Sequence, residues 1–106
     1  MNLVRENWNE ADGELFIKYL ESLKNPEKTE WARNLLKTNM PVLAIKTAVI
    51  VDLVKQINQG NYLSFLDLEL NEYYENTAIN GSLISKIKDF KTMKKYLDKY
   101  VLKIDN

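Results

Sequence analysis

Thr47-Ala48-Val49-Ile50-Val51-Asp52-Leu53-Val54-Lys55-Gln56-Ile57-Asn58 combines an apolar run with the signals of two helix ends, and Gly60 follows it closely. Apolar residues occupy almost every side of a helix built from this stretch, which is typical of a helix covered on several sides. The β-branched run also suits a buried strand. Helix is favoured because threonine is a common N-cap, the stretch is long for a strand and glycine often ends a helix. We therefore predict a helix from Ala48 to about Asn58.

Helical periodicity continues on both sides, and no segment alternates convincingly as a strand. Apolar residues at spacings of three to five predict a first helix from about Asn9 or Asp12 to Lys24. Asn25 and Pro26 are typical of an N-cap and a first helical position, which predicts a second helix. Its inward-facing residues should be Trp31, Ala32, Leu35 and Leu36.

Three further helices are expected in the second half of the chain. A short one should span 62–67, and a longer one should run from about residue 71 to 88 with Gly81 inside it. Glycine is unfavourable in a helix interior, so we expect a close helix–helix contact there. Asp89 can cap the last helix, 90 to about 102. Its predicted inner stripe is Phe90, Met93, Leu97, Tyr100, Val101 and Ile104. Because the connections are short, consecutive helices should pack as antiparallel neighbours.

Composition excludes several kinds of chemistry. The chain has neither cysteine nor histidine, which rules out disulfides, thiolate metal sites and nucleophile systems built on histidine. Neither a glycine-rich phosphate loop nor metal-ligand spacing is present, so no cofactor and no metal are expected. No apolar run is long enough for a membrane span, and the N-terminus lacks a secretion signal. These features fit a cytoplasmic protein.

The formal charge is zero but unevenly distributed, with seven lysines and three acids between Lys86 and Asn106. A zero total argues against a general polyanion binder, although a local basic stripe remains compatible with it. Helical spacing places the candidate phosphate-binding lysines opposite the inner stripe of the last helix: Lys91, Lys94, Lys95 and Lys99. The alternative interpretation is a solvated outer face.

Lys46 and Thr47 form a second candidate, because a helix N-terminus with a neighbouring lysine attracts anions. The alternative there is a plain threonine cap beside an exposed lysine. Glu72 and Glu75 are interpreted as a solvated acidic helix start and not as a metal or acid–base site.

Several stretches, taken in order, resemble the bacterial DNA alkylation repair glycosylases built from HEAT-like helix pairs. They include 25–28, the loop Pro41-Val42-Leu43-Ala44-Ile45-Lys46-Thr47-Ala48, 55–57, 60–66, 72–75, 80–84, 96–100 and 104–106. The resemblance covers nearly the whole chain, and the shared order carries it more than any single motif. Three positions depart from the family pattern: Ala44 replaces its glycine, Ala48 its proline and Val51 its frequent arginine.

The resemblance implies an all-α fold, a right-handed α–α superhelix of about six helices in antiparallel pairs, forming one domain over 1–106. In that family a basic groove holds DNA, and N-alkylated purines are excised by residues in or beyond a segment that should follow Asn106. We therefore expect the N-terminal scaffold of a longer solenoid, inactive as an enzyme by itself, that binds duplex DNA weakly. The loop at Lys46 and Thr47 would border the groove.

Two other expectations accompany this one. The alternative function is a helical-repeat module for protein–protein interaction, which has retained the fold of the family but not its catalytic activity. Solenoid repeats bury their apolar faces against the next repeat, so an uncovered last repeat exposes its own. We therefore predict self-association through the C-terminal end, or fraying of it, around 100–104.

Overall fold

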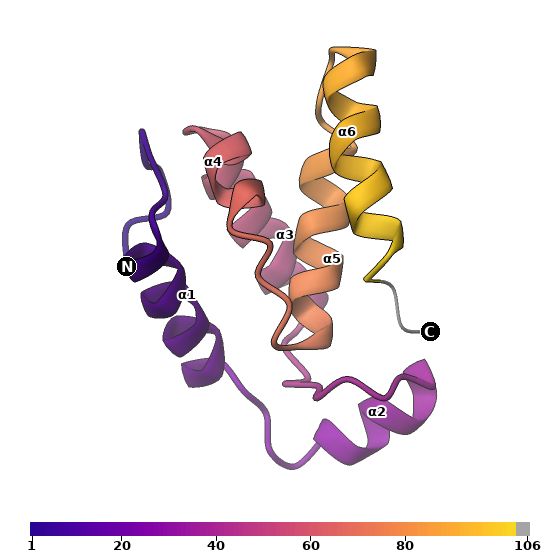
Figure 1. Ribbon diagram of the computed structural model, residues 1–106. Helices are drawn as coiled ribbons and strands as arrows, with labels where there is room; N and C mark the ends of the chain where they lie inside the picture. The colour runs from indigo at the N-terminus through magenta and orange to yellow at the C-terminus, as the bar shows by residue number, and fades with distance from the viewer. Residues whose placement is uncertain (104–106) are drawn as a thin grey trace.

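The computed structural model describes residues 1–103, which form six helices and no strand (Figure 1). The predicted all-α class is confirmed, and most helix ends fall within a few residues of their predicted positions. The helices are α1 (Glu10–Ser22), α2 (Thr29–Leu36), α3 (Thr47–Asn58), α4 (Tyr62–Asp67), α5 (Tyr74–Ile84) and α6 (Phe90–Val101).

Helix α5 is the centre of the fold, because α3, α4 and α6 all pack against it. The chain runs in opposite directions in α3 and α4, and again in α5 and α6 (Figure 1). The predicted packing of consecutive helices holds from α3 to α6, whereas α2 packs closely against neither α1 nor α3. Ile57, Ile79 and Leu83 are fully buried between these helices. The apolar run in α3 is therefore half-covered: Leu53, Val54 and Ile57 are buried, whereas Val51 is 56% exposed.

Three aromatic rings join α1 and the N-terminal segment to this core. Trp8, Phe16 and Phe65 meet edge to face, with centroid distances of 4.9 to 5.8 Å. All three are buried, and the backbone N–H of Trp8 donates to the Ser64 hydroxyl at 3.0 Å. Such perpendicular pairs are favoured by the ring quadrupoles. The cluster fixes α1 against α4 although about 50 residues separate them in the chain.

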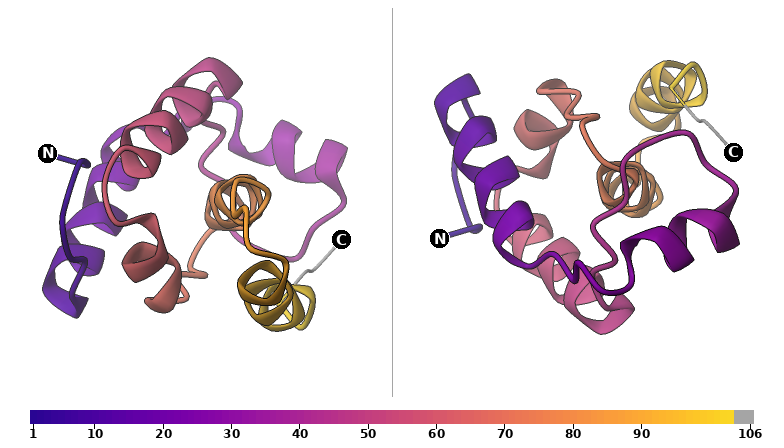
Figure 2. Two further views of the ribbon diagram at one scale, coloured as in Figure 1. Left: turned by 90° about the horizontal axis from the view of Figure 1, so that it is seen from above. Right: turned by 90° about the horizontal axis from the view of Figure 1, so that it is seen from below.

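Helix α2 departs most from expectation. It begins at Thr29 and not at Pro26, its N-cap Lys28 makes no side-chain bond, and none of its residues is buried. The predicted inward face is wrong in part, since Trp31 is 64% and Leu35 65% exposed, whereas Ala32 and Leu36 are half-buried. The reason is that the Asn25 N–H donates to the Leu43 carbonyl at 2.8 Å. The two ends of the segment 25–43 are thereby joined, and α2 lies on an excursion out of the bundle (Figures 1 and 2).

The C-terminal helices differ in their details. Helix α5 is shorter at both ends than the predicted 71–88. The predicted inner stripe of α6 is wrong in part, because Phe90, Leu97 and Val101 are 75%, 42% and 56% exposed. Met93 and Tyr100 pack inward as predicted, and Tyr96, which the prediction left out of the stripe, is buried with them. Ile104 lies outside the described residues. The Asp89 cap is confirmed, since its carboxylate accepts the Thr92 N–H at 3.0 Å.

Gly81 of α5 leaves room for Tyr100 of α6 to pack closely against it. A Cβ at this position would lie 2.6 Å from the Tyr100 hydroxyl, so the expected close helix–helix contact is confirmed. The hydroxyl passes the glycine and donates to the Thr77 carbonyl at 3.1 Å. Burial raises the pKa of Tyr100, so this neutral donor is maintained. Tyr100, and with it α6, is thus held by the backbone of α5.

Gly60 has a different role from the one its position suggests. No glycine among the described residues has a positive φ, so Gly60 does not end α3 in the left-handed conformation typical of helix stops. A Cβ there would lie 2.4 Å from the Arg5 carbonyl oxygen and 2.6 Å from its amide nitrogen. Glycine is needed because the N-terminal backbone crosses the end of α3, where the Asn61 N–H donates to the Arg5 carbonyl.

The contacts at Gly60 and Gly81 predict different losses of stability when each glycine is replaced by alanine. We expect Gly60→Ala to lower the free energy of unfolding by about 2–3 kcal/mol, because rigid backbone must move. Gly81→Ala should cost less than about 1 kcal/mol, because a side-chain tip can swing aside and alanine is the better helix former. Urea denaturation followed by circular dichroism measures both; equal costs would contradict the proposed difference between backbone and side-chain contacts.

Candidate binding surfaces

The four candidate lysines of α6 are all exposed, and they share one half of the helix. Lys91, Lys95 and Lys99 follow each other at four-residue steps and so form a row along the helix. Lys95 also lies over the Tyr96 ring at 5.6 Å. Lys94 pairs with Asp98 at 3.0 Å, but both side chains are more than 60% exposed and the pair contributes little. Within residues 1–103, Lys91, Lys95 and Lys99 form no ion pair, so the row presents positive charge to solvent.

Lys46 and Thr47 are exposed at the beginning of α3. The predicted threonine cap is wrong: Lys46 occupies the N-cap, no side chain makes a capping bond, and Thr47 is the first helical residue. The Lys46 carbonyl accepts the N–H groups of Val49 and Ile50. Lys46 also lines an open hollow of about 610 Å³ together with Lys24 and Glu27.

The structure does not combine the two lysine candidates into one surface. Helix α3 and helix α6 each pack against α5, which lies between them (Figure 2). Lys46 lies at the N-terminus of α3, whereas the lysine row follows the outer side of α6. Any binding function must therefore be assigned to these surfaces separately.

Glu75 is the residue that sequence reasoning misjudged most clearly. It is only 5% exposed and not a solvated helix-start acid, unlike its exposed neighbour Glu72. Its carboxylate accepts the backbone N–H groups of Leu43, Ala44 and Ile45 at 3.1, 3.0 and 3.4 Å. Three converging donors compensate for the burial of a charge. Glu75 therefore holds the loop that leads into α3, and we call this arrangement the Glu75 clamp.

Removing the charge of Glu75 should destabilise the fold. An amide in its place offers one acceptor oxygen and turns an N–H₂ toward backbone donors, so we expect Glu75→Gln to cost about 2 kcal/mol. Glu72→Gln is the matched control, because the same change on an exposed side chain should cost less than about 0.5 kcal/mol. Chemical denaturation of the two variants gives the comparison. Equal stabilities would show that the clamp contributes nothing.

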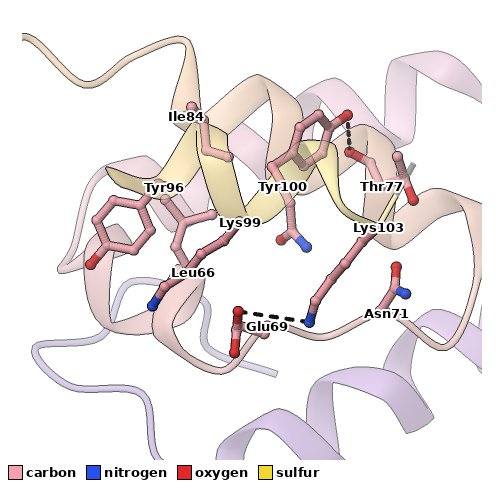
Figure 3. Close-up of a pocket in the computed structure, with 10 residues that line it drawn as sticks. Leu66, Glu69, Asn71, Thr77, Ile84, Tyr96, Lys99, Tyr100 and Lys103 are labelled. Carbon is pink, nitrogen blue, oxygen red and sulfur yellow. Dashed lines mark hydrogen bonds and ion pairs between the residues drawn. The ribbon is translucent and has the colours of Figure 1, made fainter. Parts of the chain in front are cut away.

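A small, partly open space lies between α6, α5 and the segment 66–71 (Figure 3). Its volume is about 30 Å³, enough for one or two water molecules and too small for an organic ligand. Lys103 reaches Glu69 across it at 3.7 Å. Burial and a 2.6 Å hydrogen bond to Asp67 raise the pKa of Tyr96 to about 12. The space is therefore a packing feature of α6.

Two apolar surfaces of the molecule are exposed. On α2, Trp31 and Leu35 are four positions apart and lie on the same side. On α6, Phe90, Leu97 and Val101 share one side and form what we call the α6 edge. Exposed apolar clusters of this kind mark interaction surfaces more often than single exposed residues do. Sequence periodicity could find both helices but placed these faces inside.

Residues 1–103 contain no group of three or more acidic residues placed to hold a metal ion. None of the helices in this part of the chain is both long and apolar enough to cross a membrane.

Comparison of the chain with protein-family models, with curated proteins and with solved structures finds no match.

Proposed function

We propose that the protein is a non-catalytic helical interaction module whose helices are arranged as HEAT-like pairs, and that α2 inserts into an apolar groove of a protein partner. The observation that carries this proposal is the exposure of Trp31 and Leu35 on a helix that buries none of its residues. Two large apolar side chains that stay in water gain no hydrophobic stabilisation on folding, and covering them with a partner surface would supply about 1.5–3 kcal/mol for each.

The chemistry of α2 suits this role. Tryptophan is among the residues that contribute most to protein–protein binding, and helices commonly bind grooves through apolar side chains three or four positions apart. Both ends of the α2 excursion are held, at one end by the Asn25–Leu43 bond and at the other by the Glu75 clamp. The helix is thus presented on a fixed base, which lowers the entropy lost on binding.

A second candidate is a scaffold for duplex DNA, the N-terminal part of a DNA-alkylation-repair-like protein without its catalytic segment. The lysine row on α6 favours it, because Lys91, Lys95 and Lys99 are exposed and no ion pair is formed by any of them in residues 1–103. One backbone angle also supports the resemblance. Ala44, which replaces the family's glycine, has φ 61°, a conformation that glycine adopts most readily.

The two candidates make opposite predictions for fluorescence anisotropy with a labelled duplex. A DNA scaffold should bind saturably at 50 mM salt, and three lysine–phosphate contacts would give a log–log salt slope of about −3. Lys91→Gln with Lys95→Gln should then weaken binding at least about tenfold, whereas Lys28→Gln with Lys55→Gln, also exposed, should not. A flat titration at 50 mM salt would exclude the DNA scaffold and leave the interaction module.

The interaction module predicts site-specific crosslinking from α2. A photoreactive residue in place of Leu35 should capture one discrete protein from an extract of the source cells, and Trp31→Ala should abolish the adduct. The same photoreactive residue in place of Arg33, exposed on the opposite side of α2, should not form it. Mass spectrometry of the adducts provides the readout. Identical adducts from both positions would contradict a specific α2 surface.

A further inference from the structure

An acidic groove lies on the side of the molecule formed by α1. It has a volume of about 480 Å³ and runs between α1 and the segment 68–72. Ile17, Leu68 and Leu70 provide its apolar lining. The charged residues lining it are four glutamates and one lysine, namely Glu10, Glu14, Glu21, Glu72 and Lys18. The groove is thus apolar with a strong excess of negative charge.

The shape of the groove is fixed by two features of its walls. Gly13 lets the leucines approach α1, since a Cβ there would lie 3.1 Å from Leu68 and 3.3 Å from Leu70. Across the groove, the Tyr73 hydroxyl donates to the Glu21 carboxylate. Hydrogen bonding to Glu21 raises the pKa of Tyr73, so the phenol keeps its proton at neutral pH. The groove is therefore preformed in the folded chain.

The α6 edge has the complementary properties. Phe90, Leu97 and Val101 project an apolar ridge that is between 42% and 75% exposed. Between Phe90 and Val101 the helix carries four lysines and a single acid, Asp98. An exposed ridge with an excess of positive charge thus lies on α6, and a groove with an excess of negative charge lies beside α1.

The two surfaces cannot meet within one chain, because α1 and α6 lie at opposite sides of the molecule (Figure 1). We propose that the α6 edge of one copy docks into the acidic groove of a second copy. Pairing α6 with α6 would place lysines against lysines, and pairing groove with groove would place glutamates against glutamates; both arrangements are repulsive. Only the head-to-tail contact joins apolar to apolar and opposite charges at once.

A contact of this kind is heterologous, so each copy still has one free groove and one free edge after the first contact. Assembly therefore continues with concentration, as a ring or as a filament. Because charges flank the apolar contact, salt should weaken it. The proposal does not depend on α2, and its test contains no DNA, so its outcome is distinguishable from those of both candidate functions.

A charge-exchange experiment tests the proposal. Variant A carries Glu10→Lys and Glu14→Lys in the groove, and variant B carries Lys91→Glu and Lys94→Glu on α6; all four side chains are exposed. Sedimentation velocity should show that the unmodified chain associates as its concentration rises, whereas A alone and B alone are monomers. An equimolar mixture should associate again, because each reversed surface then meets its complement.

Matched controls test whether charge reversal matters only on the two proposed surfaces or anywhere on the molecule. Glu6→Lys with Glu30→Lys, and Lys28→Glu with Lys55→Glu, change exposed residues outside both surfaces and should leave association within about twofold of the unmodified chain. Circular dichroism establishes that every variant is folded. Three results would each overturn the proposal: an unmodified chain that stays monomeric at millimolar concentration, association of A alone, or a mixture of A and B that remains monomeric.

Discussion

The Glu75 clamp is the interaction on which the remaining structure depends. It ties a loop with three successive amide donors to the first turn of α5, the helix against which α3, α4 and α6 pack. The same loop accepts the Asn25 N–H through the Leu43 carbonyl, and the Pro41 carbonyl accepts the Tyr74 N–H. One short stretch of extended chain therefore connects the end of α1, the start of α3 and the centre of the bundle. The exposed position of α2 is a consequence of this constraint.

Backbone contacts determine orientation in the second half as well. Tyr100 passes over Gly81 and donates to the Thr77 carbonyl of α5, and Tyr96 on the same side of α6 is buried and donates to Asp67. Leu97, on another side of α6, is exposed. The exposed apolar side of α6 is therefore the side that remains once Tyr96 and Tyr100 pack inward.

The sequence predicts helices well and their faces poorly. Periodicity found the six helices, and the odd glycine at 81 indicated a close contact that is present. It could not reveal that Glu75 is buried, because an acid near a helix start is ordinarily solvated and its partners are backbone amides 30 residues away. It assigned Trp31 to the core for a similar reason: amphipathic spacing shows that a helix has an apolar side, not whether another element covers it. Tertiary hydrogen bonds decide that question.

The distribution of charge bears directly on what the lysines of α6 are for. Equal numbers of basic and acidic residues give the chain a formal net charge of zero, so its net charge provides no attraction for a polyanion. The charges are nevertheless segregated, with glutamates along α1 and lysines along α6. A molecule with opposite charges at opposite sides is attracted to copies of itself in a head-to-tail orientation. In that orientation the apolar residues beside the two charged groups would also contact each other. Segregated charge within a neutral total therefore favours the α6 lysines as part of a contact between copies over a role in holding phosphates.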